Sequence, residues 1–433
     1  MYEKALDVIR STETVGHIGK IEDVVGMAIE ASGSRCSIGD IVQIYSEEKN
    51  TQVPAEVVGF RGGRIQLMTY EATGGITSGS FVRNTGHRLQ IPVGDFLKGR
   101  IIDATGKPID GGPAFPKCRT YTVSSSYSNP LERPPIRERL DFGVKAIDGL
   151  NTIGKGQRIG IFAGSGVGKS TLMGMIAKNV KTDINVIALV GERGREVLEF
   201  AQKDLGKEGM ERSVLVVATS DQPAMLRQKC PLVATTIAEY FRDQGMDVLL
   251  MMDSLTRFAM AQREIGLAIG EPPIARGYTP SIYAEFPKLL ERSGNFRKGS
   301  ITGVYTVLVE GDDTNEPIAD TVRGILDGHI VLSRALAAEN HYPAISIGDS
   351  ISRLMTEIVD ERHRKLAAKM RNILGVYQKN ADLISIGAYK KGMNPELDEA
   401  VRLYPAINQF LMQGVNESFT YEETLDRMEK ALT

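Results

Sequence analysis

The chain of 433 residues has no tryptophan and only three cysteines. Cys36, Cys118 and Cys230 are widely spaced and odd in number, which excludes a disulfide framework and matches no zinc motif. We expect them to be packing residues in a reducing compartment. No apolar run approaches the ~18 residues of a membrane span, and the charged N-terminus does not resemble a signal peptide. These absences predict a soluble, cytoplasmic protein.

Neither sign of charge is in excess. Lys and Arg total 52 against 54 for Asp and Glu, which gives a net charge of −2. A dedicated nucleic-acid binder would carry a clear basic excess, so we expect no nucleic-acid partner. Hydrophobic residues make up 42% of the chain, enough for several buried cores. At about 150 residues per domain, the length predicts roughly three domains.

The first predicted domain, residues 1–92, contains short apolar runs separated by glycine-containing turns. Many short strands with regular turns indicate a small antiparallel barrel or sandwich, and we predict a β-barrel. Residues 1–10 are predicted to form a short amphipathic helix that leads into it. The predicted strands are Val24–Ile29, Ile41–Tyr45, Ala55–Phe60 and Arg64–Met68.

The second predicted domain, residues 93–350, begins with an extended linker rich in Gly and Pro at 93–140. Apolar strands then alternate with helices, which predicts an α/β fold with a parallel sheet covered on both faces. From 351 to 433, apolar residues recur at helical spacing and predict a helical domain. The strands expected in the sheet are Arg158–Phe162, Asn185–Val190, Ser213–Ala218, Asp247–Met252 and Gly303–Val309.

The strongest motif is a phosphate-binding loop between a predicted strand and a predicted helix. Its glycines let backbone N–H groups turn toward an anion, and the helix N-terminus adds a partial positive charge. We expect Lys169 to reach the β- and γ-phosphates of a nucleotide and Ser170 to bind Mg²⁺. The first position is Ala where the pattern has Gly, a departure that it tolerates. The expected nucleotide-binding residues are Ala163, Gly164, Ser165, Gly166, Val167, Gly168, Lys169, Ser170 and Thr171.

Two carboxylates follow predicted strands and so face the ligand crevice of a parallel sheet. Asp253 is expected to bind Mg²⁺, although it can also cap the helix that begins near Ser254. Glu192 could polarise the attacking water, and the adjacent Arg193 could pair with the γ-phosphate. The alternative for Glu192 and Arg193 is that they belong to a solvated surface cluster of salt bridges, because the stretch Glu192–Glu196 is densely charged.

These motifs resemble those of the catalytic subunits of rotary ATPases. The matching stretches are Gly164–Ser170, Val190–Arg193, Asp253–Ala259, Tyr342–Ile345 and Asp349–Arg353. Further stretches are similar to the flagellar protein-export ATPases and their type III secretion relatives, namely Gly191–Glu196, Gln262–Leu267 and Gly270–Pro273. The resemblance extends over residues 15–433.

The resemblance implies roles for single residues. Glu192 matches the catalytic carboxylate of the family and Arg193 its phosphate-contacting neighbour. Arg353 matches an arginine supplied across a subunit interface to the γ-phosphate of the next copy, with an interface salt bridge as the alternative. Tyr342 matches an aromatic residue that stacks on adenine, and otherwise would be a half-buried tyrosine beside a proline.

The resemblance also implies an assembly and its partners. It predicts an ATPase that acts as a homohexameric ring and energises protein export through the flagellar type III apparatus. The implied partners are ATP, stalk and regulatory proteins, the export apparatus, and exported proteins with their chaperones. The implied location is the cytoplasmic, inner face of the cell membrane. Residues 266–281 are predicted to line the pore of the ring or to form a surface connection.

Two departures from the wider family are visible. Ser346 stands where relatives commonly carry Asp, and the acidic lever sequence of the ATP synthase β subunit is absent. The absence of the acidic lever favours an export ATPase over a subunit of ATP synthase. Alternatives are an ATPase of virulence secretion, a subunit of a proton-coupled rotary ATP synthase, a non-catalytic nucleotide-binding subunit, and an RNA translocase similar to transcription-termination factor Rho. Basic residues scattered over the barrel with few aromatics between them argue against RNA.

Overall fold

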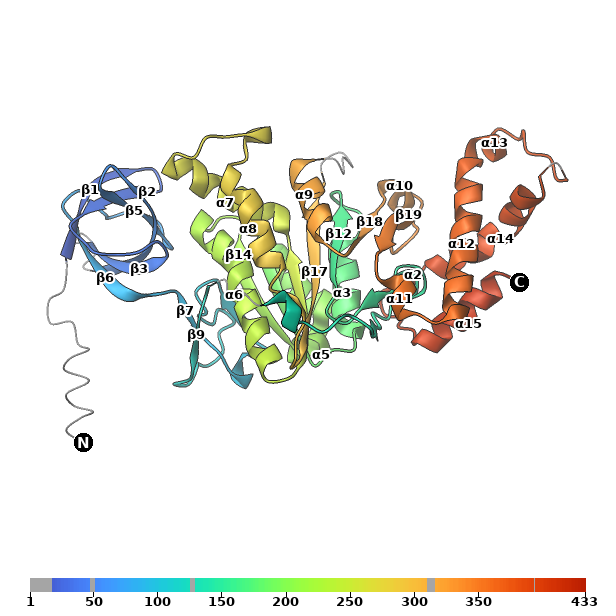
Figure 1. The fold of residues 1–433 in the computed structure, drawn as a ribbon, viewed down its shortest axis with the longest axis horizontal. Coiled ribbons are helices and arrows are strands. Elements are labelled where there is room, and N and C mark those ends of the chain that lie inside the picture. The colour runs from blue at the N-terminus through green and yellow to red at the C-terminus, as the bar shows by residue number, and fades with distance from the viewer. Residues whose placement is uncertain (1–17, 47–50, 125–128, 310–315, 393) are drawn as a thin grey trace.

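The computed structural model describes residues 18–46, 51–124, 129–309, 316–392 and 394–433. The molecule is elongated, with a β-barrel at one end, a sheet flanked by helices in the middle and a group of helices at the other end (Figure 1). The predicted order of barrel, α/β part and helical part is therefore confirmed. The helix predicted for residues 1–10 lies outside the described residues.

Six antiparallel strands close the barrel in the order β1-β2-β5-β4-β3-β6. Their alternating residues, among them Ile29, Val42 and Leu67, fill the interior. The single strand predicted at Val24–Ile29 is wrong, because a turn with Gly26 in the left-handed region (φ 61°) divides it into two strands. The strands are β1 (Ile18–Val25), β2 (Ala28–Ser32), β3 (Asp40–Ser46), β4 (Thr51–Arg61), β5 (Arg64–Thr69) and β6 (Phe81–Arg88).

A buried polar contact joins the barrel to the α/β part. Lys229 on helix α6 (Ala224–Asp243) places its Nζ 2.7 Å from Glu56 Oε1 on β4. The Tyr70 hydroxyl donates a hydrogen bond to the same carboxylate. All three side chains are at least nine-tenths buried, so removing one partner would leave an uncompensated polar group in the interior.

The central sheet has nine strands, eight of them in the order β19-β18-β12-β17-β15-β13-β14-β8, with β16 paired to β17. The strands from β18 to β8 are parallel, and β19 is antiparallel to β18. The five predicted strands are all present. The bounds are β8 (Ile101–Asp103), β12 (Arg158–Ala163), β13 (Ile184–Glu192), β14 (Ser213–Thr219), β15 (Asp247–Asp253), β16 (Gly294–Asn295), β17 (Ser300–Leu308), β18 (Gly328–Leu332) and β19 (Ile345–Ser352).

Helices cover both faces of this sheet, and each face has its own buried apolar cluster. Helix α6 packs on β13, β14 and β15, whereas α3 lies on the other face with α2. The helices of this part, besides α6, are α2 (Lys145–Leu150), α3 (Lys169–Asn179), α4 (Gly194–Glu199), α5 (Gly206–Glu211), α7 (Leu255–Ile269), α8 (Pro280–Leu290), α9 (Pro317–Ile325) and α10 (Arg334–Ala338).

The segment predicted as a linker, residues 93–140, is only partly one. Strand β8 lies inside it and adds to the edge of the central sheet beside β14. A three-residue strand flanked by glycines and prolines offers too short an apolar run to be recognised from sequence. Short strands also attach both ends of the segment: β7 (Gln90–Pro92) pairs with β9 (Thr120–Thr122), and β10 (Arg139–Leu140) pairs with β11 (Ile153–Gly154).

The described residues of the C-terminal part form five helices. The helices α12, α14 and α15 pack on one another and on α2 of the central part. The predicted boundary between residues 350 and 351 falls within β19, which continues to Ser352. The helices are α11 (Met355–Ile358), α12 (Glu361–Lys379), α13 (Ala381–Ser385), α14 (Pro395–Leu411) and α15 (Tyr421–Ala431).

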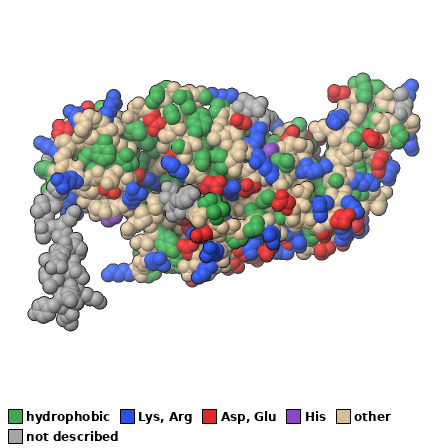
Figure 2. All heavy atoms as spheres, in the orientation of Figure 1, with side chains coloured by type: hydrophobic (Ala, Val, Ile, Leu, Met, Phe, Trp, Pro, Cys, Tyr) green, Lys and Arg blue, Asp and Glu red, His purple; other side chains and the backbone are tan. Residues whose placement is uncertain are grey.

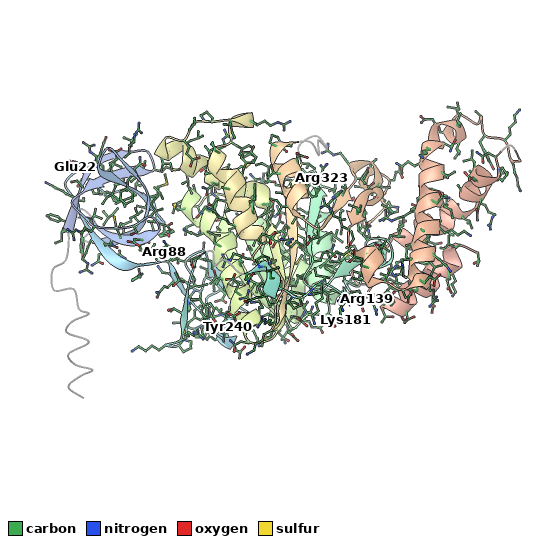
Figure 3. The ribbon with its side chains drawn as sticks, viewed as in Figure 1. Glu22, Arg88, Arg139, Lys181, Tyr240 and Arg323 are labelled. Carbon is green, nitrogen blue, oxygen red and sulfur yellow. The ribbon has the colours of Figure 1, made fainter. Side chains whose placement is uncertain are left out.

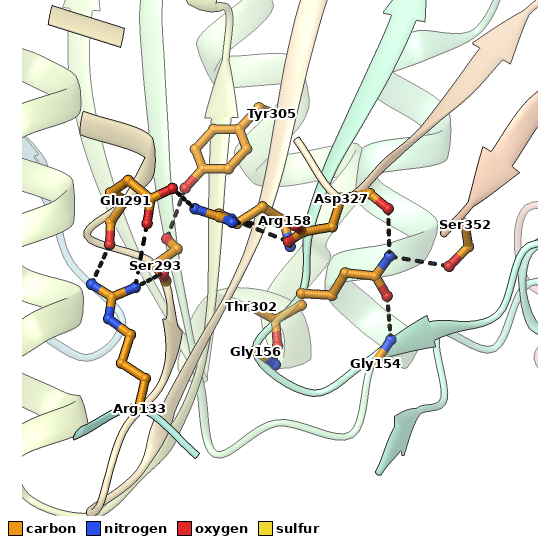
Figure 4. Close-up of polar contacts among 11 residues, drawn as sticks. Arg133, Gly154, Gly156, Arg158, Glu291, Ser293, Thr302, Tyr305, Asp327 and Ser352 are labelled. Atoms are coloured by element: carbon orange, nitrogen blue, oxygen red, sulfur yellow. Dashed lines mark hydrogen bonds and ion pairs between the residues drawn. The ribbon is translucent and has the colours of Figure 1, made fainter. Parts of the chain in front are cut away.

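A polar network fixes the start of β12, the strand that leads into the phosphate-binding loop (Figure 4). Arg158 donates from Nε and Nη2 to the carboxylate of Asp327, at 3.1 Å each, and also pairs with Glu291 after α8. Arg133 of the linker donates to the backbone carbonyl of Ser293, at 3.1 Å. The network lies at the amino end of β12, so it anchors the strand from the end opposite the loop.

The visible surface carries Lys and Arg interspersed with Asp and Glu, without a large area of one sign (Figure 2). Among the described residues, no helix is both long and apolar enough to span a membrane.

Candidate functional site

The phosphate-binding loop has the strand–loop–helix context that the sequence predicts. Strand β12 ends at Ala163 and α3 begins at Lys169. Gly168 lies between them in the left-handed region, with φ 88°, which residues with a Cβ rarely adopt. A Cβ at this position would also lie 3.4 Å from ring carbons of Tyr342. Glycine is therefore favoured here by the backbone conformation of the turn, and the Tyr342 ring lies in contact distance of the position.

A cavity of about 760 Å³ lies over this loop. Glu192 and Arg193 line it together with nearly all of the predicted loop residues, so the structure brings these groups into one site. Val167 is the exception, since its side chain is buried in the core and only its backbone belongs to the loop. The loop residues that line the cavity are Ala163, Gly164, Ser165, Gly166, Gly168, Lys169, Ser170 and Thr171.

Two acidic side chains meet Lys169 at the carboxyl ends of neighbouring strands. Asp253 ends β15 and Glu192 ends β13, and these strands are adjacent and parallel. The ammonium of Lys169 contacts Asp253 and lies 3.7 Å from Glu192 Oε1. Thr306 donates a hydrogen bond of 2.7 Å to Asp253 Oδ1, which fixes the carboxylate from the side of β17. The expected cluster of one cation and two carboxylates is thus present.

The environment of Glu192 favours its protonated form. Burial is the main cause and the negative charge of Asp253 adds to it, while Lys169 opposes them; the pKa of Glu192 is raised to about 7. The Glu196 carboxyl shares a hydrogen bond with it, and this bond helps to lower the pKa of Glu196. A carboxyl group that titrates near neutral pH beside a phosphate-binding loop is suited to general-base work.

The donor set suits Mg²⁺ bound with a nucleotide. Ser170 offers a hydroxyl and Asp253 a carboxylate, and hard oxygen donors are those that Mg²⁺ prefers. No group of three or more His, Cys, Asp or Glu side chains able to hold a metal occurs among the described residues. This fits a site in which one or two protein oxygens act together with phosphate oxygens and water.

Tyr342 borders a second cavity, of about 740 Å³, next to the phosphate-binding loop. Its side chain is 41% exposed, and Phe410 and Phe419 of the C-terminal part line the same cavity. A flat heterocycle could pack among these rings, which agrees with the expected adenine contact. Sequence reasoning missed both phenylalanines because they lie more than 230 residues from the loop and belong to no motif.

Arg353 does not join the site of its own chain. It follows β19, is exposed, and is absent from both cavities. Its Nη2 donates to the backbone carbonyl of Arg323 at the end of α9, at 3.4 Å. An arginine that acts on a γ-phosphate from this position has to reach the nucleotide of another copy.

Sequence reasoning also missed Arg257, which lines the cavity from the first turn of α7. Its Nε is buried and has no hydrogen-bond partner among the described residues. Its Nη1 donates to the sulfur of Met260 at 3.9 Å. A buried guanidinium N–H without an acceptor beside a phosphate-binding loop is a group that an anion can satisfy. The signal was available, because Arg257 stands in the stretch Asp253–Ala259 that carried the resemblance.

Comparison with known proteins finds a family match for each of the three parts of the chain, the β-barrel, the central part and the C-terminal part. Residues 143–352 match the nucleotide-binding domain of the ATP synthase alpha/beta family, and residues 21–86 match its β-barrel domain. Residues 359–430 match the C-terminal domain of the type III secretion ATPase EscN. The "Flagellum-specific ATP synthase" of Bacillus subtilis is 55% identical over 424 residues, covering 98% of this chain and 97% of that protein. This chain belongs to the flagellar and type III secretion ATPase family.

Other relatives agree with this family membership. The "Type 3 secretion system ATPase" of Xanthomonas euvesicatoria is 46% identical over 98% of this chain and 97% of that protein. The structure of the assembled ATPase EscN from enteropathogenic E. coli superposes with a TM-score of 0.91 at 46% identity, covering 96% of this chain and all of that one. EscN in complex with its central stalk EscO gives a TM-score of 0.88 at 45% identity, covering 96% of this chain and all of that one.

The family membership confirms the predicted activity. The chain is an ATPase that works in flagellar or type III protein export. Because its C-terminal part matches the EscN domain, the export branch is favoured over a subunit of a rotary ATP synthase, as the absent acidic lever suggested.

Proposed function

We propose that the protein hydrolyses ATP in a Mg²⁺-dependent reaction as a homohexameric ring that energises flagellar protein export. Its relatives named for the flagellum, at 55% and 50% identity, support the flagellar assignment over virulence secretion. The assembled EscN structure and its complex with the stalk EscO support a ring that works with a stalk protein. We extend the proposal to regulatory proteins, the export apparatus at the inner face of the membrane, and exported proteins with their chaperones.

The proposed reaction uses residues that line the first cavity, together with Asp253, which contacts Lys169, and Tyr342 of the second cavity. Lys169 moves from Asp253 to the β- and γ-phosphates, and the backbone N–H groups of the loop hold their oxygens. Ser170 and Asp253 would hold Mg²⁺, which would supply charge stabilisation for the transferring phosphoryl group. Glu192 in its ionised form orients the attacking water and takes up its proton. Arg193 and Arg257 contact the phosphate oxygens, and Tyr342 packs against adenine.

The observation that carries the assembly proposal is the position of Arg353. It lies outside the cavity that holds the other groups of its own chain, at an exposed end of β19. We infer that it reaches the γ-phosphate of the neighbouring copy, where an arginine finger contributes about 10³–10⁵ in rate. A single copy would then lack part of its site. The division into domains at residues 92 and 350 remains part of this proposal.

Mixed assemblies test this proposal. Glu192→Gln copies have no base but keep Arg353, and Arg353→Ala copies have a base but no arginine. Each variant alone is expected to be nearly inactive. A mixture of the two is expected to regain activity at interfaces where Glu192 of one copy meets Arg353 of the other. Activity per copy of the wild-type protein is expected to rise with concentration. A mixture no more active than its parts, together with a concentration-independent wild-type rate, would refute the role of Arg353 in trans.

The flagellar role has its own test. Wild-type protein is expected to restore swimming to a bacterium that lacks its flagellar export ATPase, and the Glu192→Gln variant is expected not to. Restored secretion through a virulence apparatus without restored swimming would assign the protein to the other branch.

A further inference from the structure

The loop between α7 and α8 is a closed, internally bonded structure. Ile274 N–H donates to the carbonyl of Tyr278 at 2.7 Å, and Ser281 N–H donates to the carboxylate of Glu271 at 3.2 Å. The Arg263 guanidinium lies over the Tyr278 ring, 5.9 Å from its centroid. These contacts fix the loop to both neighbouring helices, so it is more than a slack surface connection.

Arg276 occupies an unusual backbone conformation in this loop. Its φ of 51° and ψ of 27° lie in the left-handed region, which residues with a Cβ adopt at an energetic cost. Its Nη1 lies 3.3 Å from Glu316 Oε1. The loop thus holds this arginine in a costly conformation, and the side chain so presented meets a carboxylate.

Glu316 belongs to the nucleotide cavity. Its side chain is only 10% exposed, and it lines the same cavity as Lys169 and Glu192. A nearly buried carboxylate beside the site of a polyphosphate would repel that anion unless a cation compensated it. Arg276 supplies such a cation, so the position of the loop bears on the charge of the cavity.

Helix α9 begins directly after Glu316 and leads to the residue that holds Arg353. It starts with Pro317, and its last turn contains Arg323, whose carbonyl accepts the hydrogen bond from Arg353. Arg323 is labelled in Figure 3, in the part of the molecule where Figure 1 labels α9 and α10. One short helix therefore contacts the nucleotide cavity of its own chain at one end and the arginine offered to the neighbour at the other.

We propose that Glu316 is a positioning residue through which the loop 270–278 and the occupancy of the nucleotide cavity set the placement of Arg353. Arg276 holds Glu316 from the loop side, and α9 carries a displacement of Glu316 to the carbonyl of Arg323. This rests on the proposed action of Arg353 in trans. Through this chain of contacts, the nucleotide bound to one copy, or a force on its loop 270–278, would change the rate of hydrolysis in the next copy.

A charge exchange tests the link between the loop and the cavity. Arg276→Glu and Glu316→Arg each place two like charges together, and the double variant restores opposite charges. We expect each single variant to lower kcat roughly 2- to 30-fold, the range of energetic coupling between linked sites, and the double variant to recover most of that loss. Arg297→Gln, at an exposed arginine in another loop, is the matched control. Single variants at wild-type kcat, or a double variant no better than its parts, would refute the link.

The mixed assembly tests the link to Arg353. In this mixture the Glu192→Gln copy has no active site of its own and contributes only its Arg353 to the site of its neighbour. A second substitution in that copy therefore reports only on how well it places Arg353. We expect Glu192→Gln with Glu316→Gln to support the Arg353→Ala copy less well than Glu192→Gln by itself, with a lower kcat and an unchanged KM. Circular dichroism and assembly size should be unaffected, since Glu316→Gln keeps the shape of the side chain.

The outcomes separate this inference from the function on which it rests. If Glu192→Gln and Arg353→Ala copies do not complement each other at all, the action of Arg353 in trans fails, and the inference fails with it. If they complement each other, and the added Glu316→Gln in the donor leaves the regained rate unchanged, only the α9 link is refuted. If the added substitution raises KM in place of lowering kcat, the α9 link is refuted as well.

Discussion

The ammonium of Lys169 contacts Asp253 and lies 3.7 Å from Glu192, so one cation stands between the two carboxylates that the chemistry needs. A nucleotide that draws this cation to its phosphates leaves both carboxylates with less compensating charge. In the proposed reaction, Mg²⁺ held by Asp253 would restore the balance. The arrangement makes nucleotide and metal binding interdependent.

Replacing Glu192 by Gln should separate binding from turnover. Glutamine keeps the shape of the side chain but cannot take a proton from water, so we expect kcat to fall by about 10²–10⁴. The dissociation constant of a fluorescent ATP analogue, measured by titration, should change by no more than a few-fold. Glu199→Gln, at an exposed glutamate of α4, should retain wild-type turnover. Wild-type kcat in the Glu192 variant would refute the assignment of the base.

The raised pKa of Glu192 predicts how the reaction depends on pH. The base works in its ionised form, and its pKa in the nucleotide-free protein is about 7. Because kcat/KM reports on groups of the free enzyme, it should fall about tenfold per pH unit below that value and level off above it. The residual activity of Glu192→Gln should lack this acid limb. An unchanged acid limb in the variant would assign the titration to another group.

Arg257 should contribute to phosphate binding. Its unpartnered Nε lies in the wall of the nucleotide cavity, and a hydrogen bond to a charged group is worth about 1.5–3 kcal/mol. Arg257→Ala is therefore expected to weaken ATP binding about 10- to 150-fold, measured as KM and by analogue titration. Arg195→Gln, which removes an exposed arginine of α4, is the control. Equal affinities of wild type and Arg257→Ala would exclude a phosphate contact.

Most of the fold could be predicted because its signals are local. Several of the parallel strands are apolar runs that end at a glycine or a carboxylate, and the run Arg158–Phe162 leads into a loop whose spacing is specific. The same locality identified Asp253 and Glu192, since each is the last residue of an apolar strand. Burial and the negative charge of Asp253, which raise the pKa of Glu192, depend on the packing of β13 beside β15, a strand that is distant in sequence.

The parts that could not be predicted depend on contacts across long sequence separations. Strand β8 is three residues long and is defined by its pairing with β14, more than 100 residues away. Phe419 joins the cavity at Tyr342 only because the C-terminal helices fold back on the central part. Glu316 and Arg276 have no motif, and their pairing appears only in three dimensions.

Asp148 should be important for stability, although it takes no part in the reaction. It is fully buried on α2, and burial raises its pKa to about 7. Its two carboxylate oxygens accept from the backbone N–H groups of Phe142 and Gly143, at 2.8 and 2.7 Å. Asparagine has one acceptor oxygen, so Asp148→Asn would leave one buried N–H unpaired.

The expected cost of Asp148→Asn is about 1–3 kcal/mol of the free energy of unfolding, measured by urea denaturation at pH 8. Glu132→Gln also removes a carboxylate but from an exposed position, and it should change stability by less than about 0.5 kcal/mol. If both variants unfold at the same urea concentration as the wild type, the buried carboxylate is not needed to pair these N–H groups.

His363 predicts a loss of stability in acid at the contact between α12 and α2. Its Nε2–H donates to the carbonyl of Gly149 at 2.7 Å, and its Nδ1 accepts from the Tyr421 hydroxyl at 3.0 Å. This pattern is that of the neutral ring, which burial favours by lowering the pKa of His363 below its ordinary value of 6.5. The folded state thus binds fewer protons than the unfolded state once the pH falls below about 6.5, so protonation favours unfolding.

The free energy of unfolding should therefore decrease as the pH falls from about 6.5 toward the lowered pKa of His363, and be insensitive to this residue above pH 7.5. His363→Gln can still form hydrogen bonds but does not titrate, so its stability should depend less steeply on pH between 5 and 6.5. His87→Gln, at an exposed histidine of the barrel, is the matched control and should keep the wild-type dependence. Denaturation curves of the three proteins at matched ionic strength measure the difference, and parallel curves for wild type and His363→Gln would show that another group governs the acid limb.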